Sequence, residues 1–175
     1  MQKNSYKKIG ILGGTFDPPH IGHLHISKIA LSKLKLDCLI WLLTKQNPLK
    51  KKPYFNIKTR IRLSKDITKS QKKIVVKFLD KKIKSKNTIN FIQYFKKNNK
   101  KSKLFFLIGS DNLINFHKWK KWKKIPELAK IVVFARQNFT NKALNSIAAK
   151  KLKKKDWLYI KSKKINISSS LIRKF

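Results

Sequence analysis

Cysteine is almost absent from this sequence, since Cys38 is the only one among its 175 residues. A framework of disulfides within the chain is therefore excluded, and the thiol, which stands in an apolar run over residues 37–43, is expected to be buried in the core. Long apolar runs are missing as well. No segment approaches the length needed to span a membrane, and the basic N-terminus has too short an apolar stretch for a signal peptide, so we expect a cytoplasmic location.

Acidic residues are the second shortage, with seven Asp and Glu against 45 Lys and Arg and a formal net charge of +38. So few carboxylates make a divalent metal site built entirely from protein ligands improbable, and no metal-ligating residues are predicted.

Arginine is scarce too, because 41 of the 45 basic residues are lysine. Surfaces that read nucleic acid favour the planar fork of arginine, and here the lysines are spread along the whole chain. We therefore attribute most of the charge to a compositional bias and expect nucleic acid to bind only non-specifically, through charge. Attraction of anionic nucleotides is an expected side effect. The arginines are Arg60, Arg62, Arg136 and Arg173.

Strand-like and helix-like segments alternate along the rest of the chain. Short apolar and β-branched runs predict strands at 9–12, 37–44, 74–79, 103–108, 131–136 and 156–160. Apolar residues at helical spacing predict helices from about residue 21, over 57–68, from residue 88 and over 143–152. This alternation predicts an α/β fold with a mainly parallel sheet. No linker, repeat or change of composition marks a second domain, so residues 1–175 are expected to form a single domain.

The stretch over residues 13–23 reads GGTFDPPHIGH and stands between the first predicted strand and the first predicted helix. The first amides of a helix lack intrahelical acceptors, and the helix dipole puts partial positive charge there, so this turn is a ready phosphate site. Gly13 and Gly14 let backbone come close to a ligand without an intervening Cβ. His20 and His23 are three residues apart, so both imidazoles are expected to face one pocket.

Two further turns follow predicted strands. The strand at 103–108 runs into Gly109 and Asp111, and an aspartate in that place accepts hydrogen bonds from sugar hydroxyls and caps a helix. Near the C-terminus, serines 168–170 supply hydroxyls and free amides to an oxyanion, with Arg173 one turn into the helix. The basic loop after the second strand contains Lys50, which could meet phosphate or simply be solvated.

These segments resemble a known family. Residues 13–23 are similar to the signature of the HxGH nucleotidyltransferases, and the whole chain resembles the nicotinate-nucleotide adenylyltransferases of that superfamily, most closely at 10–25, 109–122 and 167–173. The resemblance implies a Rossmann-like, doubly wound sheet with helices on both faces. It implies adenylyl transfer from ATP to nicotinate mononucleotide, giving deamido-NAD and pyrophosphate in NAD biosynthesis, with Mg²⁺ carried in by ATP.

The resemblance also assigns roles to residues. The implied catalytic residues are His20, His23 and Arg173. The implied ATP-binding residues are Gly13, Gly14, Thr15, Phe16, His20, His23, Lys50, Gly109, Asp111, Ser168, Ser169, Ser170 and Arg173. The implied mononucleotide-binding residues are Thr88, Trp119 and Asp111. The attacking phosphate is already anionic and needs no general base, so Asp17 is expected to shape the loop.

Structural alternatives stay open for two of these residues. Thr88 is equally suited to be a plain helix N-cap, and Asn87 and Asn90 stand where the family pattern has an aromatic residue and an aspartate. Trp119 and Trp122 also fit an ordinary core stripe with i, i+3 spacing.

Two alternative functions remain as well. The first is a sister adenylyltransferase with nicotinamide mononucleotide or phosphopantetheine as acceptor. The second is a basic RNA-binding module built on a nucleotide-binding fold. A homo-oligomer is compatible with the sequence, and a membrane partner is not expected.

Overall fold

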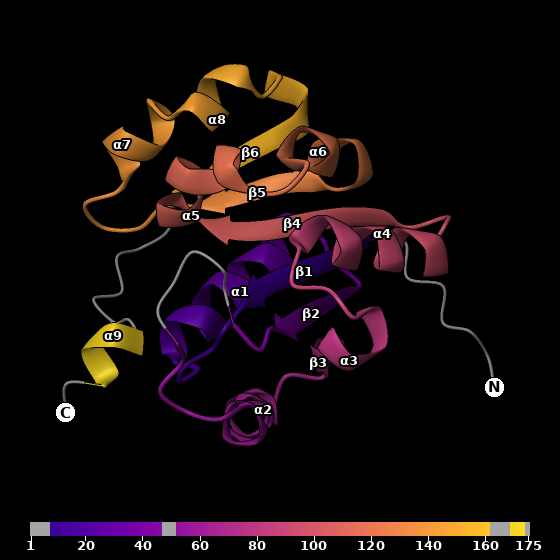
Figure 1. The fold of residues 1–175 in the computed structure, drawn as a ribbon, viewed down its shortest axis with the longest axis vertical. Coiled ribbons are helices and arrows are strands. Elements are labelled where there is room, and N and C mark those ends of the chain that lie inside the picture. Colours follow the sequence, from indigo (N-terminus) through magenta and orange to yellow (C-terminus); the bar gives the residue numbers. More distant parts are fainter. Residues whose placement is uncertain (1–7, 47–51, 162–168, 174–175) are drawn as a thin grey trace.

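Six parallel strands form one sheet in the computed structural model, which describes residues 8–46, 52–161 and 169–173 (Figure 1). The strand order is β3-β2-β1-β4-β5-β6, the arrangement of a doubly wound Rossmann-like sheet. The predicted fold class is therefore confirmed. The strands are β1 (Lys8–Gly14), β2 (Cys38–Leu43), β3 (Ile74–Phe78), β4 (Lys103–Gly109), β5 (Lys130–Phe134) and β6 (Trp157–Ile160).

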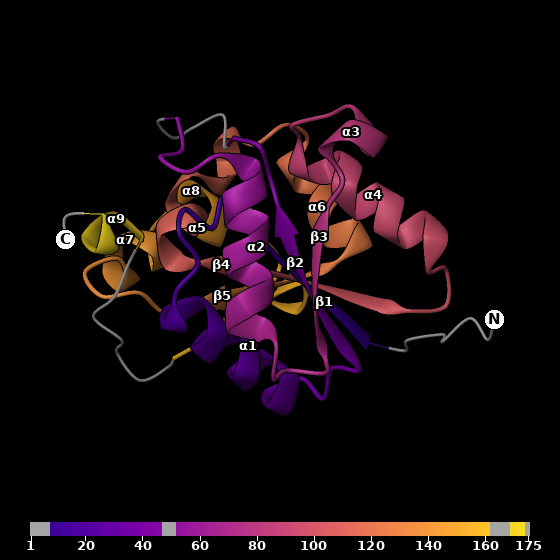
Figure 2. The ribbon, with the colours of Figure 1, turned by 90° about the horizontal axis from the view of Figure 1, so that it is seen from below.

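Helices cover both faces of the sheet. Helices α1 (Ile21–Lys33) and α2 (Ile57–Thr68) pack on one face, and Figure 2 shows them in front of the strands. The other face is covered mainly by α4 (Thr88–Asn98), with the short elements α3 (Asp80–Ile83), α5 (Ser110–Asn115), η1 (Phe116–Lys118), η2 (Trp122–Lys124), α6 (Ile125–Leu128), α7 (Thr140–Leu144) and α8 (Ile147–Lys151). The remaining described elements are η3 (Lys154–Asp156) and α9 (Ser169–Ile172).

The two cores follow from the alternation of side chains along the strands. In β1, Ile9 and Ile11 enter the core under α4, whereas Leu12 enters the core under α1 and α2. Every residue of β2 is buried, as expected for a strand covered on both faces. A Cβ at Gly10 would lie 2.5 Å from Leu39 Cδ1, so this glycine allows β1 to pack closely against its neighbours.

Most of the predicted elements are confirmed, and α2 has the predicted bounds. The helix predicted over residues 143–152 is wrong, because the chain forms two short helices, α7 and α8, instead. Ser146 interrupts the helix: its backbone is extended and its Oγ accepts a hydrogen bond from Ala149 N at 3.2 Å, which caps α8. Cys38 is buried, as predicted, and burial raises the pKa of its thiol.

No helix within the described ranges is both long enough and apolar enough to cross a membrane. The longest, α1, has 13 residues.

Candidate active site

The strand order reverses between β1 and β4, and several of the predicted site residues stand at or just after the ends of these two strands. In an open parallel sheet, ligands bind outside the carboxyl ends of the strands at such a switch point. Gly13 and Gly14 end β1, and Gly109 ends β4. The sheet thus brings together two turns that are about a hundred positions apart in the sequence.

His20 and His23 cap helix α1 reciprocally. His20 is the N-cap residue, and its Nδ1 accepts from Gly22 N at 3.1 Å, while its own backbone N donates to His23 Nδ1 at 3.3 Å. The two ring centroids are 3.9 Å apart, so the imidazoles lie side by side at the start of α1. Because each Nδ1 accepts a hydrogen bond, the neutral rings must carry their proton on Nε2.

His20 is held neutral by its surroundings. The side chain is only 5% exposed, and burial, helped by the positive charge of Arg136, lowers the pKa of His20 from 6.5 to about 4. Its Nε2 is buried and has no hydrogen-bond partner among the described residues. A buried donor without a protein partner at the start of a helix is well placed for an anionic ligand, because leaving it unpaired is costly.

His23 is packed among aromatic rings. The centroid of Phe16 lies 4.8 Å from the imidazole, and Phe16 in turn stacks on Trp41 at 4.8 Å. Behind the helix, Trp41 Nε1 donates to Ser27 Oγ at 2.8 Å, and Ser27 Oγ donates to the backbone oxygen of His23 at 2.7 Å. Phe16 is buried, so its side chain packs against His23 and is not exposed to a ligand.

The Phe16 backbone is left-handed, with φ of 48°, which is uncommon for a bulky residue. Such a conformation persists only where surrounding contacts hold it, and it often marks a functional turn. Asp17 and Arg60 make such contacts on the two sides of Phe16.

Asp17 joins three segments. Its carboxylate accepts from the amides of Tyr54 and Phe55 at 2.7 and 2.8 Å, and it pairs with Arg173 at 3.3 Å. Arg173 also donates to the backbone oxygen of Asp17, and Ser169 Oγ donates to the Pro18 oxygen at 2.8 Å. The C-terminal helix α9 is thereby docked on the turn that carries His20, and Asp17 shapes the loop, as expected.

Arg60 is a member of this site that the sequence reasoning missed. It is 2% exposed, and its guanidinium donates to four backbone oxygens at the carboxyl ends of β1 and β2 and at the start of α2. The signal that could have found it is its residue type, since the chain uses lysine almost everywhere else.

At the end of β4, Asp111 pairs with Arg136 at 2.9 Å, and Arg136 N donates to Ser110 Oγ at 2.9 Å. A Cβ at Gly109 would lie 2.4 Å from Asp111 Oδ1 and 2.9 Å from Arg136 Cδ, so this pair requires glycine there. Arg136 is the second residue that was missed. Its position at the carboxyl end of the predicted strand at 131–136 was the available signal.

Trp119 lies on the other side of the β1 turn from α1. Its ring packs against Phe106 and Phe116 at 6.0 and 5.1 Å, and Phe106 lies 3.5 Å from the position of a Cβ on Gly13. Trp119 and Trp122 both pack against the core, on Phe116, as the core-stripe interpretation expects. They do not share one helix, because Trp119 has an extended backbone between η1 and η2. Trp119 is half-buried and therefore retains an accessible surface for a ring.

Other predicted residues lie elsewhere or outside the described ranges. Thr88 is the first residue of α4, while the N-cap position falls on Asn87, so the plain N-cap interpretation of Thr88 is wrong. Lys50 and Ser168 lie outside the described residues, and Ser170 is described only as part of α9.

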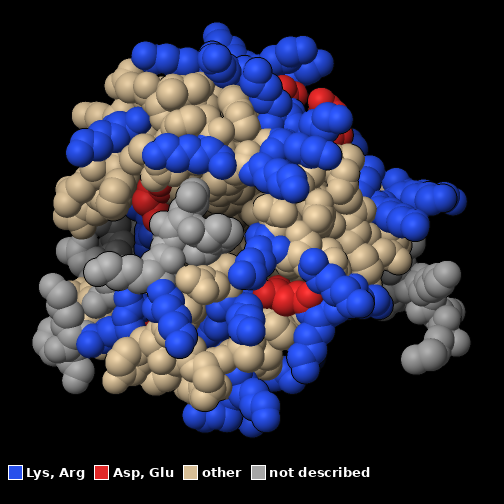
Figure 3. Space-filling model, viewed as in Figure 1, with Lys and Arg blue, Asp and Glu red and all other residues tan. Residues whose placement is uncertain are grey.

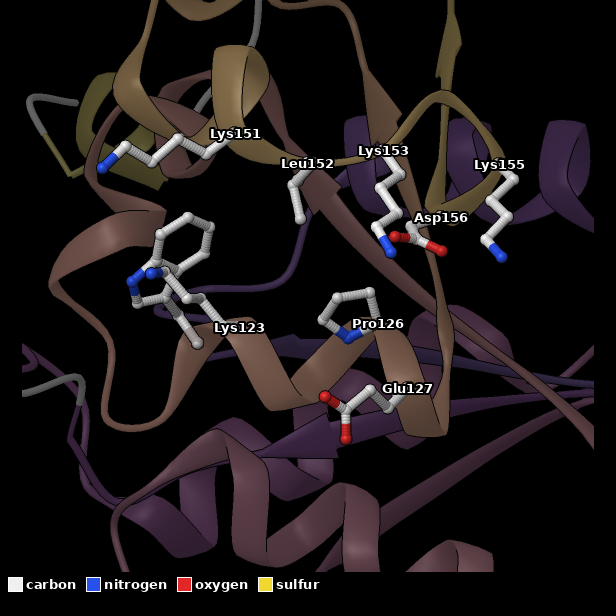
Figure 4. A pocket seen from close by; sticks show the side chains of 9 residues that line it. Lys123, Pro126, Glu127, Lys151, Leu152, Lys153, Lys155 and Asp156 are labelled. Carbon is white, nitrogen blue, oxygen red and sulfur yellow. The ribbon is translucent and has the colours of Figure 1, made fainter.

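A surface cavity of about 400 Å³ lies apart from this site (Figure 4). Its lining comes from η2, α6, η3 and the end of α8, elements that precede β5 and β6 and so lie toward the amino ends of those strands. Lys123, Lys151, Lys153 and Lys155 line it, but Lys and Arg side chains are scattered over much of the visible face of the molecule (Figure 3). Their presence in this hollow therefore follows from composition.

The chain is similar to known proteins over nearly its whole length. A family model described as cytidylyltransferase-like matches residues 11–175. The probable nicotinate-nucleotide adenylyltransferase of Pelagibacter ubique is 48% identical over 167 residues, which cover 95% of this chain and 92% of that protein. The probable nicotinate-nucleotide adenylyltransferase of Agrobacterium fabrum is 31% identical, with 94% of this chain and 97% of that protein covered.

The fold is shared with solved structures. Plasmodium falciparum nicotinic acid mononucleotide adenylyltransferase complexed with NaAD superimposes with a TM-score of 0.77 at 21% identity, covering 97% of this chain and 83% of that one. A putative nicotinate-nucleotide adenylyltransferase from Vibrio parahaemolyticus superimposes with a TM-score of 0.67 at 20% identity, covering 96% of this chain and 85% of that one.

Proposed function

This chain belongs to the cytidylyltransferase-like family, and we propose that it transfers the adenylyl group of ATP to nicotinate mononucleotide. In the proposed reaction an oxygen of the mononucleotide 5′-phosphate attacks the α-phosphorus of ATP. The bond from that phosphorus to the oxygen that bridges it to the β-phosphorus breaks, and pyrophosphate leaves with the electron pair. The product is deamido-NAD, so the reaction is a step of NAD biosynthesis. We further propose that residues 1–175 act as one nucleotidyltransferase domain.

The observation that supports this reaction most strongly is the buried, unpartnered Nε2 of His20 at the start of α1. Reciprocal capping commits both Nδ1 atoms, so His20 and His23 offer Nε2–H donors to phosphate oxygens. Because these donors and the first helix amides are already oriented, they stabilise charge that develops in the transition state without reorganising. No general base is required, and Asp17 is committed to two amides and to Arg173.

The remaining roles are proposed by position. Ser169 and Arg173 hold α9 against the turn and so bring the start of that helix to the triphosphate. Gly13, Gly14, Gly109 and Asp111 stand at the two strand ends, where the ribose and phosphates would pass. Trp119 offers an aromatic face to the electron-poor pyridine ring of the mononucleotide, with Thr88 from α4 as a further contact.

Mg²⁺ is proposed to arrive as the complex of ATP, as part of the substrate. Among the described residues no three His, Cys, Asp or Glu side chains are grouped so that they could hold a metal ion. Asp17 and Asp111 are engaged by Arg173 and Arg136, so the phosphates supply the ligands better than these carboxylates do. When bound, the ion neutralises charge on the leaving pyrophosphate.

Pyrophosphate release with ATP and each of three acceptors tests the proposal. Nicotinate mononucleotide is expected to give the highest kcat/KM, above nicotinamide mononucleotide and phosphopantetheine. A preference for either of the other acceptors would overturn the choice of substrate. Absence of turnover with all three, together with tight, salt-sensitive binding of RNA, would instead favour a nucleic-acid-binding module.

A further inference from the structure

Arg60 is a buried cation in the first turn of α2, the helix that packs against β3 and α1. Its Nε donates to Phe55 O at 3.0 Å, one terminal nitrogen donates to Thr15 O at 2.6 Å and Thr44 O at 2.8 Å, and the other donates to Lys45 O at 3.0 Å. Four of its five N–H groups are therefore used on backbone oxygens.

These four carbonyls belong to three segments: the ends of β1 and β2, which are neighbours in the sheet, and the loop before α2, which is not part of the sheet. Thr15 follows β1 and immediately precedes the left-handed Phe16, while Thr44 and Lys45 follow β2. Phe55 stands just before α2, and its amide is bound by the Asp17 carboxylate. A guanidinium and a carboxylate thus hold the same short segment, one through its carbonyl and the other through its amides.

Lysine cannot make this set of contacts. An ammonium group has three donors at one point, whereas the guanidinium spreads five donors over a planar fork. Burial lowers the pKa of Arg60, while Asp17 and Asp80 raise it. A chain that uses lysine at 41 of 45 basic positions keeps arginine here, at the one buried cation among the described residues.

We propose that Arg60 is a positioning residue for the adenylyl-transfer site, which rests on the function proposed above. By fixing the Thr15 carbonyl against the ends of β2 and the start of α2, it holds the backbone bend at Phe16. That bend directs the following residues to the start of α1, where His20 and His23 stand. Arg60 itself touches no reacting atom in this arrangement.

The test compares Arg60→Lys with Arg62→Lys, a matched control two residues along the same helix. The Arg62 side chain is 69% exposed and makes only a surface ion pair with Asp66 at 3.5 Å. We expect Arg60→Lys to lower kcat by about 10- to 100-fold, because a misplaced site costs rate even when the change is remote from the chemistry. The KM for ATP should rise and the KM for nicotinate mononucleotide should stay within about twofold, since Trp119 is packed on β4. Arg62→Lys should match the wild type in kcat and in the KM values for both substrates.

Stability must be separated from positioning. The kinetics are therefore measured at a low temperature where circular dichroism shows each variant to be folded, and Arg60→Gln, which keeps two donors, serves where Arg60→Lys does not fold. Wild-type kinetic constants in a folded Arg60 variant would overturn the proposal. So would a rate loss that disappears on cooling, or failure of both variants to fold, because either result assigns Arg60 a purely structural role.

A substrate-free readout separates this inference from the proposed function. The chain has four histidines, so the imidazole ¹H–¹⁵N spectrum is simple to compare between variants. Arg60→Lys should shift the resonances of His20 and His23, and Arg62→Lys should leave all four in place. An inactive wild type with this pattern of shifts would refute the function and keep the positioning role. An active wild type with no shift in Arg60→Lys would support the proposed function and refute the positioning role.

Discussion

Protonation of His20 should make the folded protein sensitive to mild acid, and His20→Asn tests this. The pKa of His20 is lowered from 6.5 to about 4, first by burial and second by the charge of Arg136. His20 is therefore protonated near pH 6.5 in the unfolded chain, but only near pH 4 in the folded protein. The stability that the neutral ring supports is complete above the unfolded pKa and is lost as the pH falls from there toward 4.

The size of the effect follows from these two pKa values. Between about pH 7.5 and pH 5, linkage gives a loss of about 2 kcal/mol in the free energy of unfolding from this residue alone. Because burial is the larger cause, raising the salt concentration should reduce this loss only slightly, since salt screens only the part due to Arg136. Asparagine is the matched substitution: its side-chain oxygen can accept from Gly22 N, as His20 Nδ1 does, but it does not titrate.

The assay is urea denaturation of wild type and His20→Asn at both pH values, followed by the fluorescence of the four tryptophans. The wild type should lose about 2 kcal/mol more than the variant between the two conditions. Equal losses in the two proteins would show that folding does not lower the pKa of His20, which would refute the reasoning. A high concentration of phosphate should weaken the pH dependence, because a bound anion raises the pKa of the histidine.

Three further predictions concern kinetics. His23→Ala should lower kcat by about 100-fold or more while circular dichroism shows an intact fold, because it removes a transition-state donor; a nearly normal kcat would contradict that role. Trp119→Ala should raise the KM for nicotinate mononucleotide more than the KM for ATP in steady-state assays, and equal effects on both would count against stacking. Trp41→Phe removes the hydrogen bond to Ser27 Oγ, so kcat should fall several-fold with little change in either KM, whereas Trp157→Phe on the edge strand should leave kcat unchanged.

The sheet and the turn after β1 were predictable because their signals are local. Runs such as CLIWLL are apolar throughout, which a strand buried on both faces requires, and the glycines and prolines of residues 13–19 mark where the strand must end. The prediction of one helix over 143–152 was wrong for a local reason too. Apolar spacing continues through Ser146, but its hydroxyl accepts a hydrogen bond from Ala149 N and caps a new helix, α8.

The supports of the site were not predictable, because they depend on contacts between distant segments. Arg60 lies 45 residues from Thr15, and Arg173 lies 156 residues from Asp17. Neither periodicity nor spacing can pair such residues. The rarity of arginine could have singled out Arg60 in this lysine-rich chain, but it could not have named the four carbonyls that Arg60 binds. The tautomer of His20 follows only from the hydrogen bonds that the folded turn makes.

The few carboxylates at this edge act on the protein's own cations. Asp17 orients Arg173 and Asp111 orients Arg136, so each acid fixes an arginine beside the turn that bears the two histidines. If the acids were free, they would repel the incoming phosphates, and if they were absent, the arginines would have no fixed direction. Paired in this way, they lose most of their repulsion, and the two arginines are already ordered at this edge. An edge of this kind suits a reaction between two polyanions, in which the protein must hold both reactants in line and needs to move no proton of its own.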